Sequence, residues 1–197
     1  MFNGIVESTG VIRRLSIEKD CLKMNVIPHK KFSDLTIGDS ISVNGVCLTI
    51  TALINESFDI TIVPETIRLS NLGQLSMGSL VNLERSIKNN HRINGHYVQG
   101  HVDATCEIIE LKKDGEDAVI LKINMPPQLA KYIVRKGYIA LDGMSITVID
   151  IAETWFAVTL IPHTREVTIA NHYHMGKKVN VEVDILGKYV EKLLRNQ

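Results

Sequence analysis

The chain has no excess of charge of either sign and few aromatic side chains. Lys and Arg together number 22, as do Asp and Glu, and aromatic residues make up 5% of the 197 positions. Nucleic acids and anionic membranes are usually held by a basic patch, and single-stranded nucleic acid also stacks on aromatic rings. We therefore expect neither nucleic acid nor a membrane as a partner.

Cysteines are also few, and the three that occur are odd in number, far apart and never in a CxxC pair. Neither a disulfide framework nor a structural zinc site is expected from this pattern. His91, His96 and His101 lie five residues apart, a spacing that aligns side chains on neither a helix nor a strand. We therefore predict no metal site.

Signals for export are missing as well. The first residues carry no basic region followed by an apolar stretch, and no apolar run approaches the roughly 18 residues that span a membrane. Scattered cysteines suit a reducing compartment, so we expect a cytoplasmic protein.

What the sequence does contain is a repeat of domain size. FDITIVPET at 58–66 returns as FAVTLIPHT at 156–164, and MGSLVNLE at 77–84 returns as MGKKVNVE at 175–182. Each copy lies 98 residues after its counterpart (156 − 58), which is half of the 197-residue chain. A period of this length indicates a duplicated folding unit and not a solenoid. Two copies of a unit offer two copies of a pocket, which suits two similar ligands.

Each half has the pattern of short antiparallel strands. Apolar residues alternate on both sides of Asn44-Gly45 and again around Asp142-Gly143, which predicts a tight hairpin in each half. Helical patterns are short: 127–136 begins with proline and precedes a glycine, and 28–38 is weaker. Many short strands with only one or two short helices in each half favour an all-β fold with one small antiparallel barrel in each half.

We expect domains at 1–90 and 96–186, joined by a polar stretch, and a C-terminal helix at 187–197. An apolar stripe with helical spacing runs through the tail and consists of Ile185, Leu186, Tyr189, Val190, Leu193 and Leu194. So short a helix is not stable alone in water and must pack on something. Its own barrel and another subunit are the two alternatives.

Alternation along a strand places a cysteine on the polar face. After the first hairpin turn, Val46, Leu48 and Ile50 share one face, and Cys47 and Thr49 share the other. A barrel strand with a solvated outer face explains the threonine, but cysteine is among the most buried residue types. Cys47 therefore indicates a covered pocket on this face.

The two copies differ in their polar residues. Three pairs of equivalent positions carry different chemistry: Cys47 and Ser145, Ile5 and His101, and Glu65 and His163. Histidine transfers protons near neutral pH, so His101 is a candidate acid or base. Such differences are expected if two similar sites do different jobs. The segments 64–66 and 162–164 can also be interpreted as helix entries capped by threonine.

With these motifs in view, the chain resembles the riboflavin synthases. The match runs from Met1 to about Asp184 and is carried by MFNGIVE at 1–7, NGVCLT at 44–49, VQGHVD at 98–103, DGMSITV at 142–148 and LIPHT at 160–164. The resemblance implies a tandem duplication of a six-stranded Greek-key β-barrel that binds lumazine, with short helices and a C-terminal helix. It also implies a homotrimer, and it allows an association with lumazine synthase.

The activity implied by the resemblance is a dismutation of two molecules of 6,7-dimethyl-8-ribityllumazine without a cofactor. One molecule loses a four-carbon unit and leaves as 5-amino-6-ribitylaminouracil, and the other becomes riboflavin. In the family each active site lies between the N-terminal barrel of one subunit and the C-terminal barrel of a neighbour.

Site residues follow from the resemblance position by position. The N-barrel pocket is expected to be lined by Gly4, Ile5, Val6, Cys47, Leu48, Thr49, Thr61, Ile62, Val63, Pro64, Glu65 and Thr66. The C-barrel pocket is expected to be lined by Gly100, His101, Val102, Lys136, Ser145, Ile146, Thr147, Leu160, Ile161, Pro162, His163, Thr164 and Arg165.

Cys47 and His101 are the catalytic candidates, with Ser40, Ser145 and Thr147 assisting. His101 is expected to transfer a proton, whereas Cys47 could add to the ring, orient a water or shape the pocket. The competing interpretation is a lumazine protein, which has the same double barrel but binds one lumazine or flavin as an optical antenna. Those proteins depart from the synthase pattern at the positions of Cys47 and His101, both of which are present here.

Overall fold

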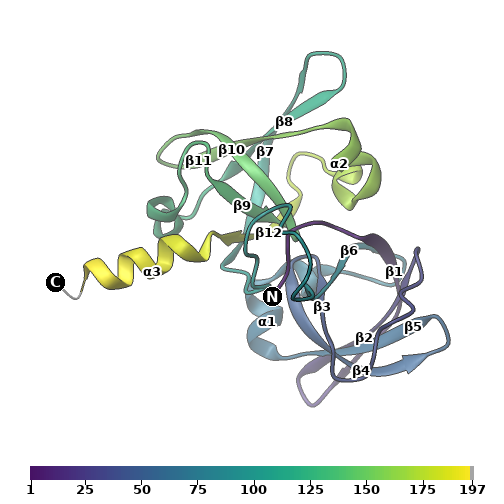
Figure 1. The fold of residues 1–197 in the computed structure, drawn as a ribbon. Helices are drawn as coiled ribbons and strands as arrows, with labels where there is room; N and C mark the ends of the chain where they lie inside the picture. Colours follow the sequence, from purple (N-terminus) through teal and green to yellow (C-terminus); the bar gives the residue numbers. More distant parts are fainter. Residues whose placement is uncertain (196–197) are drawn as a thin grey trace.

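Residues 1–195, which the computed structural model describes, form two closed barrels of antiparallel strands that lie against each other (Figure 1). The first barrel comes from the first half of the chain and the second from the second half. The predicted all-β fold and tandem duplication are therefore confirmed.

The N-terminal barrel has the strand order β1-β2-β5-β4-β3-β6. Its strands are β1 (Ser8–Glu18), β2 (Cys21–Pro28), β3 (Ser40–Val43), β4 (Val46–Ile54), β5 (Ser57–Ile62) and β6 (Leu80–Arg85). The strands β3, β4 and β5 pair in sequence, and β6 returns to pair with β3, which is the Greek-key arrangement.

The C-terminal barrel repeats this topology with the order β10-β11-β8-β7-β12-β9. Its strands are β7 (Ala104–Asp114), β8 (Ala118–Asn124), β9 (Tyr138–Leu141), β10 (Met144–Ile151), β11 (Trp155–Leu160) and β12 (Lys178–Val183). Each barrel closes around its own apolar core, because alternate residues of every strand point inward. Phe58 and Phe156, which are equivalent in the repeat, are among the largest fully buried side chains.

Helices are confined to short pieces. The α-helices α1 (Pro64–Leu69) and α2 (Pro162–Val167) follow β5 and β11, and each leads into a 3-10 turn, η1 (Asn71–Gln74) or η3 (Ile169–His172). A further 3-10 turn is η2 (Pro127–Tyr132). The 64–66 and 162–164 segments are thus helix entries, as one interpretation held.

Three details of the helix predictions were wrong. The caps are Val63 and Ile161, since the threonines already lie inside the helices. The segment 127–136 is helical only to Tyr132, because Ile133 is drawn into the barrel core and the Lys136 backbone N–H donates to the Val148 carbonyl of β10. The segment 28–38 contains no helix.

The predicted hairpin turns are confirmed, and they meet at the interface between the barrels. Asn44 and Gly45 have φ angles of 48° and 78°, and Asp142 and Gly143 have φ angles of 43° and 82°. These left-handed values suit the tight turns that match strand twist. A Cβ atom on Gly45 would lie 2.6 Å from the Gly143 nitrogen, so the two turns touch backbone to backbone.

Buried amides join the turns across the interface. The Asn180 Nδ2 donates to the Asn44 carbonyl at 2.8 Å, and the Asn82 Nδ2 donates to the Asp142 carbonyl at 3.0 Å. Asn71 of η1 links to the same network through its own N–H and the Asn180 Oδ1, at 2.6 Å. All these residues are buried, so the network leaves no room for the barrels to slide.

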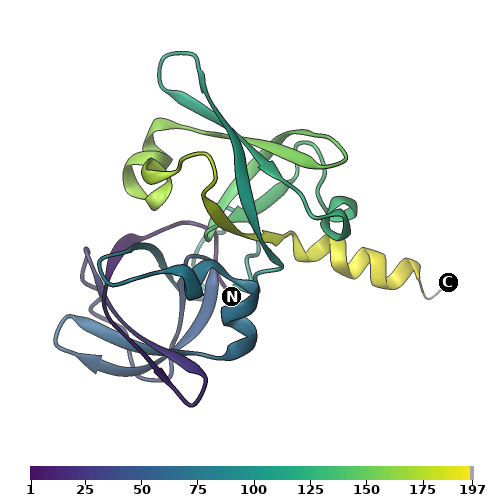
Figure 2. The ribbon, with the colours of Figure 1, turned by 180° about the vertical axis from the view of Figure 1, so that it is seen from behind.

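The C-terminal helix α3 (Ile185–Leu194) projects from the barrels (Figures 1 and 2). It begins at Ile185 and not at 187, with the Asp184 Oδ1 accepting from the Leu186 N–H at 3.0 Å, and residues 196–197 of the predicted helix lie outside the described residues. No helix within residues 1–195 is long and apolar enough to cross a membrane.

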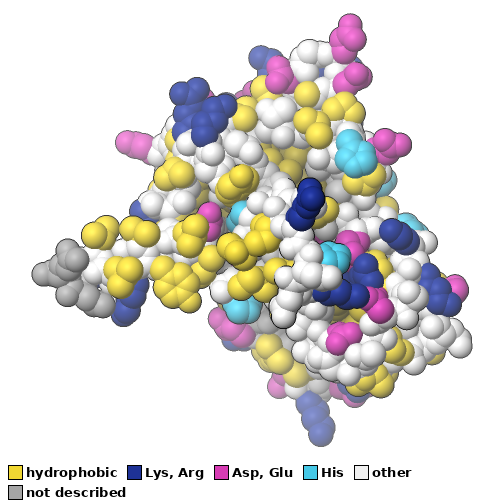
Figure 3. Space-filling view, in the orientation of Figure 1, with side chains coloured by type: hydrophobic (Ala, Val, Ile, Leu, Met, Phe, Trp, Pro, Cys, Tyr) yellow, Lys and Arg dark blue, Asp and Glu magenta, His cyan; other side chains and the backbone are white. Residues whose placement is uncertain are grey.

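The apolar stripe of α3 does not pack on its own barrel. Figure 3 shows hydrophobic side chains along the helix, and Tyr189 and Leu193 are 62% and 68% exposed. On the opposite side, Glu191 bonds to Lys131 and Tyr132 of η2. Of the two alternatives for this stripe, packing against the own barrel is therefore wrong.

We predict that Gly45→Ala lowers the free energy of unfolding by about 2–5 kcal/mol, since it adds a backbone clash to the strain of a positive φ. Gly78→Ala is the matched control: Gly78 has a φ of 85° but nothing within 4 Å of its added Cβ. It should cost about 1–2 kcal/mol, from strain alone. Thermal and denaturant unfolding would measure both, and equal losses would contradict the turn-to-turn contact.

Candidate functional site

The two segments that lead into the barrels lie side by side. Phe2 and Val98 form an antiparallel bridge in which the Phe2 N–H donates to the Val98 carbonyl at 2.7 Å and the reverse bond measures 3.2 Å. Both side chains are buried, together with Ala140. The bridge holds residues 2–6 and 98–102 close to the interface between the barrels.

From this bridge, each segment crosses to the opposite barrel. The Gly4 carbonyl accepts from the Ser145 N–H of β10, and the Gly100 carbonyl accepts from the Cys47 N–H of β4, both at 2.8 Å. Neither glycine could carry a side chain, because a Cβ at Gly4 or Gly100 would lie 2.5 Å or 2.6 Å from the Cβ of its partner.

This crossing corrects one expectation about the pockets. From the resemblance, Gly4, Ile5 and Val6 were expected to line the N-barrel pocket and residues 100–102 the C-barrel pocket. Instead, Val6 packs against the core of the C-barrel, and Val102 packs against the core of the N-barrel. A match of sequence motifs relates positions along the chain, and it carries no information about which barrel each segment touches.

The crossing brings Cys47 and the 100–102 segment together on the outer face of the N-barrel. Cys47 is half-buried and packs against the cluster of Phe2, Val98 and Ala140. His101 follows Gly100 and has an exposed side chain. Cys47 is thus partly covered and lies next to the segment that carries the histidine, and the pocket predicted on this face stays a prediction.

The equivalent place on the C-barrel is built around Ser145. Its hydroxyl lies 2.7 Å from the Nδ1 of His96, whose ring stacks on Tyr138 at a centroid distance of 5.3 Å. His96 is buried, and its Nε2 is the one buried side-chain nitrogen or oxygen of residues 1–195 that has no partner. Burial lowers the pKa of this imidazole, despite the opposing effect of Asp184.

Sequence reasoning weighed His96 only as a metal ligand and missed this contact. His96 has no counterpart in the first copy, since the equivalent position would precede Met1, and so the repeat offered no signal. Within residues 1–195 no group of three or more His, Cys, Asp or Glu side chains is arranged to hold a metal ion.

The remaining predicted site residues divide by burial. Buried positions, whose side chains belong to the barrel cores, are Leu48, Ile62, Ile146 and Leu160. Half-buried positions are Thr61, Pro64, Thr66, Thr164 and Arg165, and exposed positions are Thr49, Val63, Glu65, Lys136, Thr147, Ile161, Pro162 and His163. The core residues can offer a ligand only their backbone groups, because their side chains point inward.

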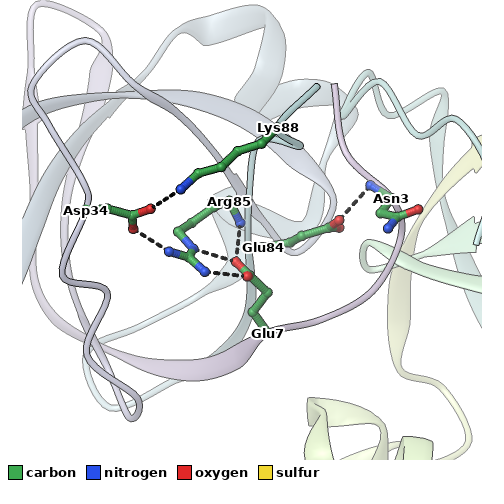
Figure 4. Close-up of polar contacts among 6 residues, drawn as sticks. All are labelled: Asn3, Glu7, Asp34, Glu84, Arg85 and Lys88. Carbon is green, nitrogen blue, oxygen red and sulfur yellow. Dashed lines mark hydrogen bonds and ion pairs between the residues drawn. The ribbon is translucent and has the colours of Figure 1, made fainter. Parts of the chain in front are cut away.

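Ser40 and Ile5 also line a cavity of about 770 Å³ between the N-barrel and residues 86–94. Its wall contains the ion pairs of Arg85 (Figure 4). Arg85 bonds to both carboxylate oxygens of Glu7, at 2.7 and 2.8 Å, and also to Asp34. Ser40 is also the cross-strand partner of Thr49, so it lies on the same strand pair, β3 and β4, as Cys47.

Two buried glutamates hold the crossing segments. Glu84 of β6 accepts from the N–H groups of Asn3 and Gly4, and Glu182 of β12 accepts from those of Gln99, Gly100 and His101. Sequence reasoning did not single them out, although both end the repeated VNLE and VNVE motifs. Burial raises the pKa of both, that of Glu84 to about 7, against the lowering effect of the backbone donors.

Comparison with known proteins matches residues 3–86 and 99–184 to the lumazine binding domain family. The chain is 40% identical to the riboflavin synthase of Bacillus subtilis, covering 98% of this chain and 90% of the relative. It is 44% identical to that of Schizosaccharomyces pombe (98% and 94%) and 42% identical to that of Mycobacterium bovis (100% and 99%).

Among solved structures, LumP complexed with riboflavin superposes with a TM-score of 0.84 at 22% identity, covering 93% of this chain and 99% of that chain. LumP complexed with 6,7-dimethyl-8-(1'-D-ribityl) lumazine gives a TM-score of 0.82, again covering 93% of this chain and 99% of that chain. At this identity the likeness establishes the double-barrel fold.

We predict a pH dependence of stability from Glu84. The pKa of Glu84 in the folded protein is raised from 4.5 to about 7, so its contribution to the free energy of unfolding is fully present below pH 4.5 and is lost as the pH rises through 7. The side chain of Glu84→Gln stays neutral at every pH. Relative to the wild type, the free energy of unfolding of this variant should therefore rise by about 3 kcal/mol between pH 4.5 and pH 8. Denaturant unfolding from pH 4.5 to 8 would measure the difference, and parallel curves for the two proteins would refute it.

Proposed function

Because the chain belongs to the riboflavin synthase family, we propose that it catalyses the cofactor-free dismutation of 6,7-dimethyl-8-ribityllumazine. Two molecules of this substrate give one riboflavin and one 5-amino-6-ribitylaminouracil, through transfer of a four-carbon unit. The two substrates are identical, so two homologous pockets are a direct way to bind them.

The observation that carries the proposal is the approach of the 100–102 segment to Cys47. The Gly100 carbonyl accepts from the Cys47 N–H at 2.8 Å, and the next residue along the chain is His101. The N-barrel pocket thereby combines the thiol of one repeat with the imidazole of the other. The C-barrel pocket instead combines Ser145 with Ile5. The two pockets of this proposal therefore differ in acid–base chemistry.

In this proposal His101 accepts the proton of the 7-methyl group, since imidazole is the side chain suited to this transfer near neutral pH. The resulting anion is delocalised over the pteridine ring and is stabilised by oriented dipoles of the pocket. The hydroxyls of Ser145 and Thr147 supply such dipoles on the C-barrel side. The half-buried Cys47 stands beside the crossing segment, where it shapes the pocket, orients a water or adds to the ring.

A second part of the proposal is that the active site forms between subunits of a homotrimer. Both outer faces, with Thr49 on one barrel and Thr147 on the other, are open in the single chain. Stacking an N-barrel face on a neighbour's C-barrel face would hold the two rings together and remove most of the entropic barrier of a bimolecular step. The exposed stripe of α3 supplies the contact between subunits.

The antenna interpretation is not favoured. Both residues at which antenna proteins depart from the synthase pattern, Cys47 and His101, are present in this chain. Identity to the synthases is also 40–44%, against 22% to LumP.

We predict that His101→Ala lowers turnover by about 100-fold or more, the usual loss of a general acid or base, with little change in substrate affinity. Cys47→Ser should also reduce turnover far more than binding. The assay mixes purified protein with 6,7-dimethyl-8-ribityllumazine alone and follows riboflavin absorbance. A stable fluorescent complex without conversion in the wild type would instead identify an antenna protein.

His174→Ala and Cys21→Ser serve as controls, because both residues lie outside the predicted site. His174 is exposed and Cys21 is half-buried, so neither belongs to a barrel core. Each should keep the wild-type rate. Wild-type turnover in His101→Ala or Cys47→Ser would remove that residue from the mechanism.

We also predict that a chain ending at Asp184 loses the trimer, because α3 is removed. Leu193→Glu tests the same contact with the helix retained: this side chain is 68% exposed in the single chain, so the substitution should leave the barrels folded. Sedimentation velocity measures the assembly state. A trimer that survives the truncation would rule out α3 as the subunit contact, and loss of activity with loss of the trimer would support a site between subunits.

A further inference from the structure

Glu182 makes an unusual set of contacts for a strand residue. Its Oε1 accepts from the Gln99 N–H at 2.7 Å, and its Oε2 accepts from the N–H groups of Gly100 and His101, both at 2.9 Å. Glu182 is only 4% exposed, so these bonds are shielded from water. Three consecutive backbone groups are thus held by one buried carboxylate.

These contacts reach from one barrel to the site of the other. Glu182 belongs to β12 of the C-barrel, whereas the segment that it holds lies against β4 of the N-barrel. Gly100 has a φ of 80° and its carbonyl accepts from the Cys47 N–H, so the chain turns sharply at this point. On the far side of His101, Val102 packs against the N-barrel core. The backbone of His101 is therefore held on both sides.

We infer that Glu182 is a positioning residue, which sets the placement of His101 beside Cys47 for proton transfer. The inference rests on the proposed function, because it assigns Glu182 a role through His101 and not through the substrate. The His101 side chain is exposed, so packing of the ring does not fix its location. Its location depends on the backbone, which is held by the bond from its own N–H to Glu182 and by the bond of the Gly100 carbonyl to Cys47.

Glu84 provides a matched comparison within the same chain. It occupies the equivalent position of the repeat and accepts from the Asn3 N–H at 2.6 Å and the Gly4 N–H at 3.1 Å. The residue that follows Gly4 is Ile5, which cannot transfer a proton. Both glutamates therefore have the same structural task, but only Glu182 holds a segment that carries a titratable side chain.

The first experiment compares Glu182→Gln with the wild type. The amide retains an oxygen for the Gly100 and His101 N–H groups but turns an NH₂ group toward the Gln99 N–H, so the segment shifts while the fold is kept. We expect kcat to fall by about 10-fold to 100-fold, the effect of a misplacement on the order of 1 Å, with KM changed by less than about threefold. Thermal unfolding and lumazine fluorescence on binding would confirm that the protein is folded and binds substrate.

The decisive experiment places the substitution on a His101→Ala background. If Glu182 acts through His101, Glu182→Gln should cause no further loss of kcat once the imidazole is absent. Glu84→Gln, whatever its own effect, should reduce activity by the same factor with and without His101. NMR of the His101 ring should show a changed chemical environment in Glu182→Gln and an unchanged one in Glu84→Gln.

Two results would overturn the inference: wild-type kcat in Glu182→Gln, or losses that multiply in the double variant. Failure of the proposed function is distinguishable, because the wild type itself would then convert no lumazine to riboflavin. Added imidazole can also be used to restore activity to His101→Ala. Equal restoration in His101→Ala and in the double variant with Glu182→Gln would support the positioning role, because a free base needs no backbone anchor.

Discussion

The contact between the two hairpin turns is the constraint on which the rest of the molecule depends. Gly45 and Gly143 have no side chains, so the turns meet backbone to backbone, and an amide from each barrel donates to the carbonyl of the opposite turn. These groups are buried, and leaving one of them without its partner costs about 1–3 kcal/mol. The relative placement of the barrels is therefore specific, and it sets the route of the segments that cross between them.

The crossing makes the surroundings of the two equivalent positions, Cys47 and Ser145, different. If each half had kept its own leading segment, Cys47 would face Ile5, and Ser145 would face His101. Instead, the segments exchange, so the residue before His101 bonds to Cys47, whereas Ser145 bonds to Gly4 and to the buried His96. Glu84 and Glu182 hold the segments in place, each from the barrel that the segment leads into. The two barrels thus share the topology of the repeat, whereas the exchange decides which polar residues meet at each of them.

Much of the fold could be predicted because its signals are local. Asn44-Gly45 and Asp142-Gly143 predicted their turns, since these residues tolerate positive φ, and alternation correctly placed Cys47 opposite the core-facing Val46 and Leu48. The helix predicted at 127–136 ends at Tyr132, because Ile133 packs into the core, and this tertiary contact outweighs helix propensity. The resemblance supplied the list of candidate residues, but it did not reveal His96 or the two glutamates.

By itself, the sequence determined that the protein is a doubled all-β barrel, where its turns lie, which strand face is polar, and that it resembles a riboflavin synthase. These properties follow from interactions among residues a few positions apart, or from direct comparison of sequences. Only the tertiary structure decided which barrel each leading segment completes, which carboxylate holds His101, and that the stripe on α3 is left open. The bonds responsible join residues such as Cys47 with Gly100 and Gly4 with Ser145, far apart in the chain. No local pattern encodes such pairs, because they form only when the two barrels dock.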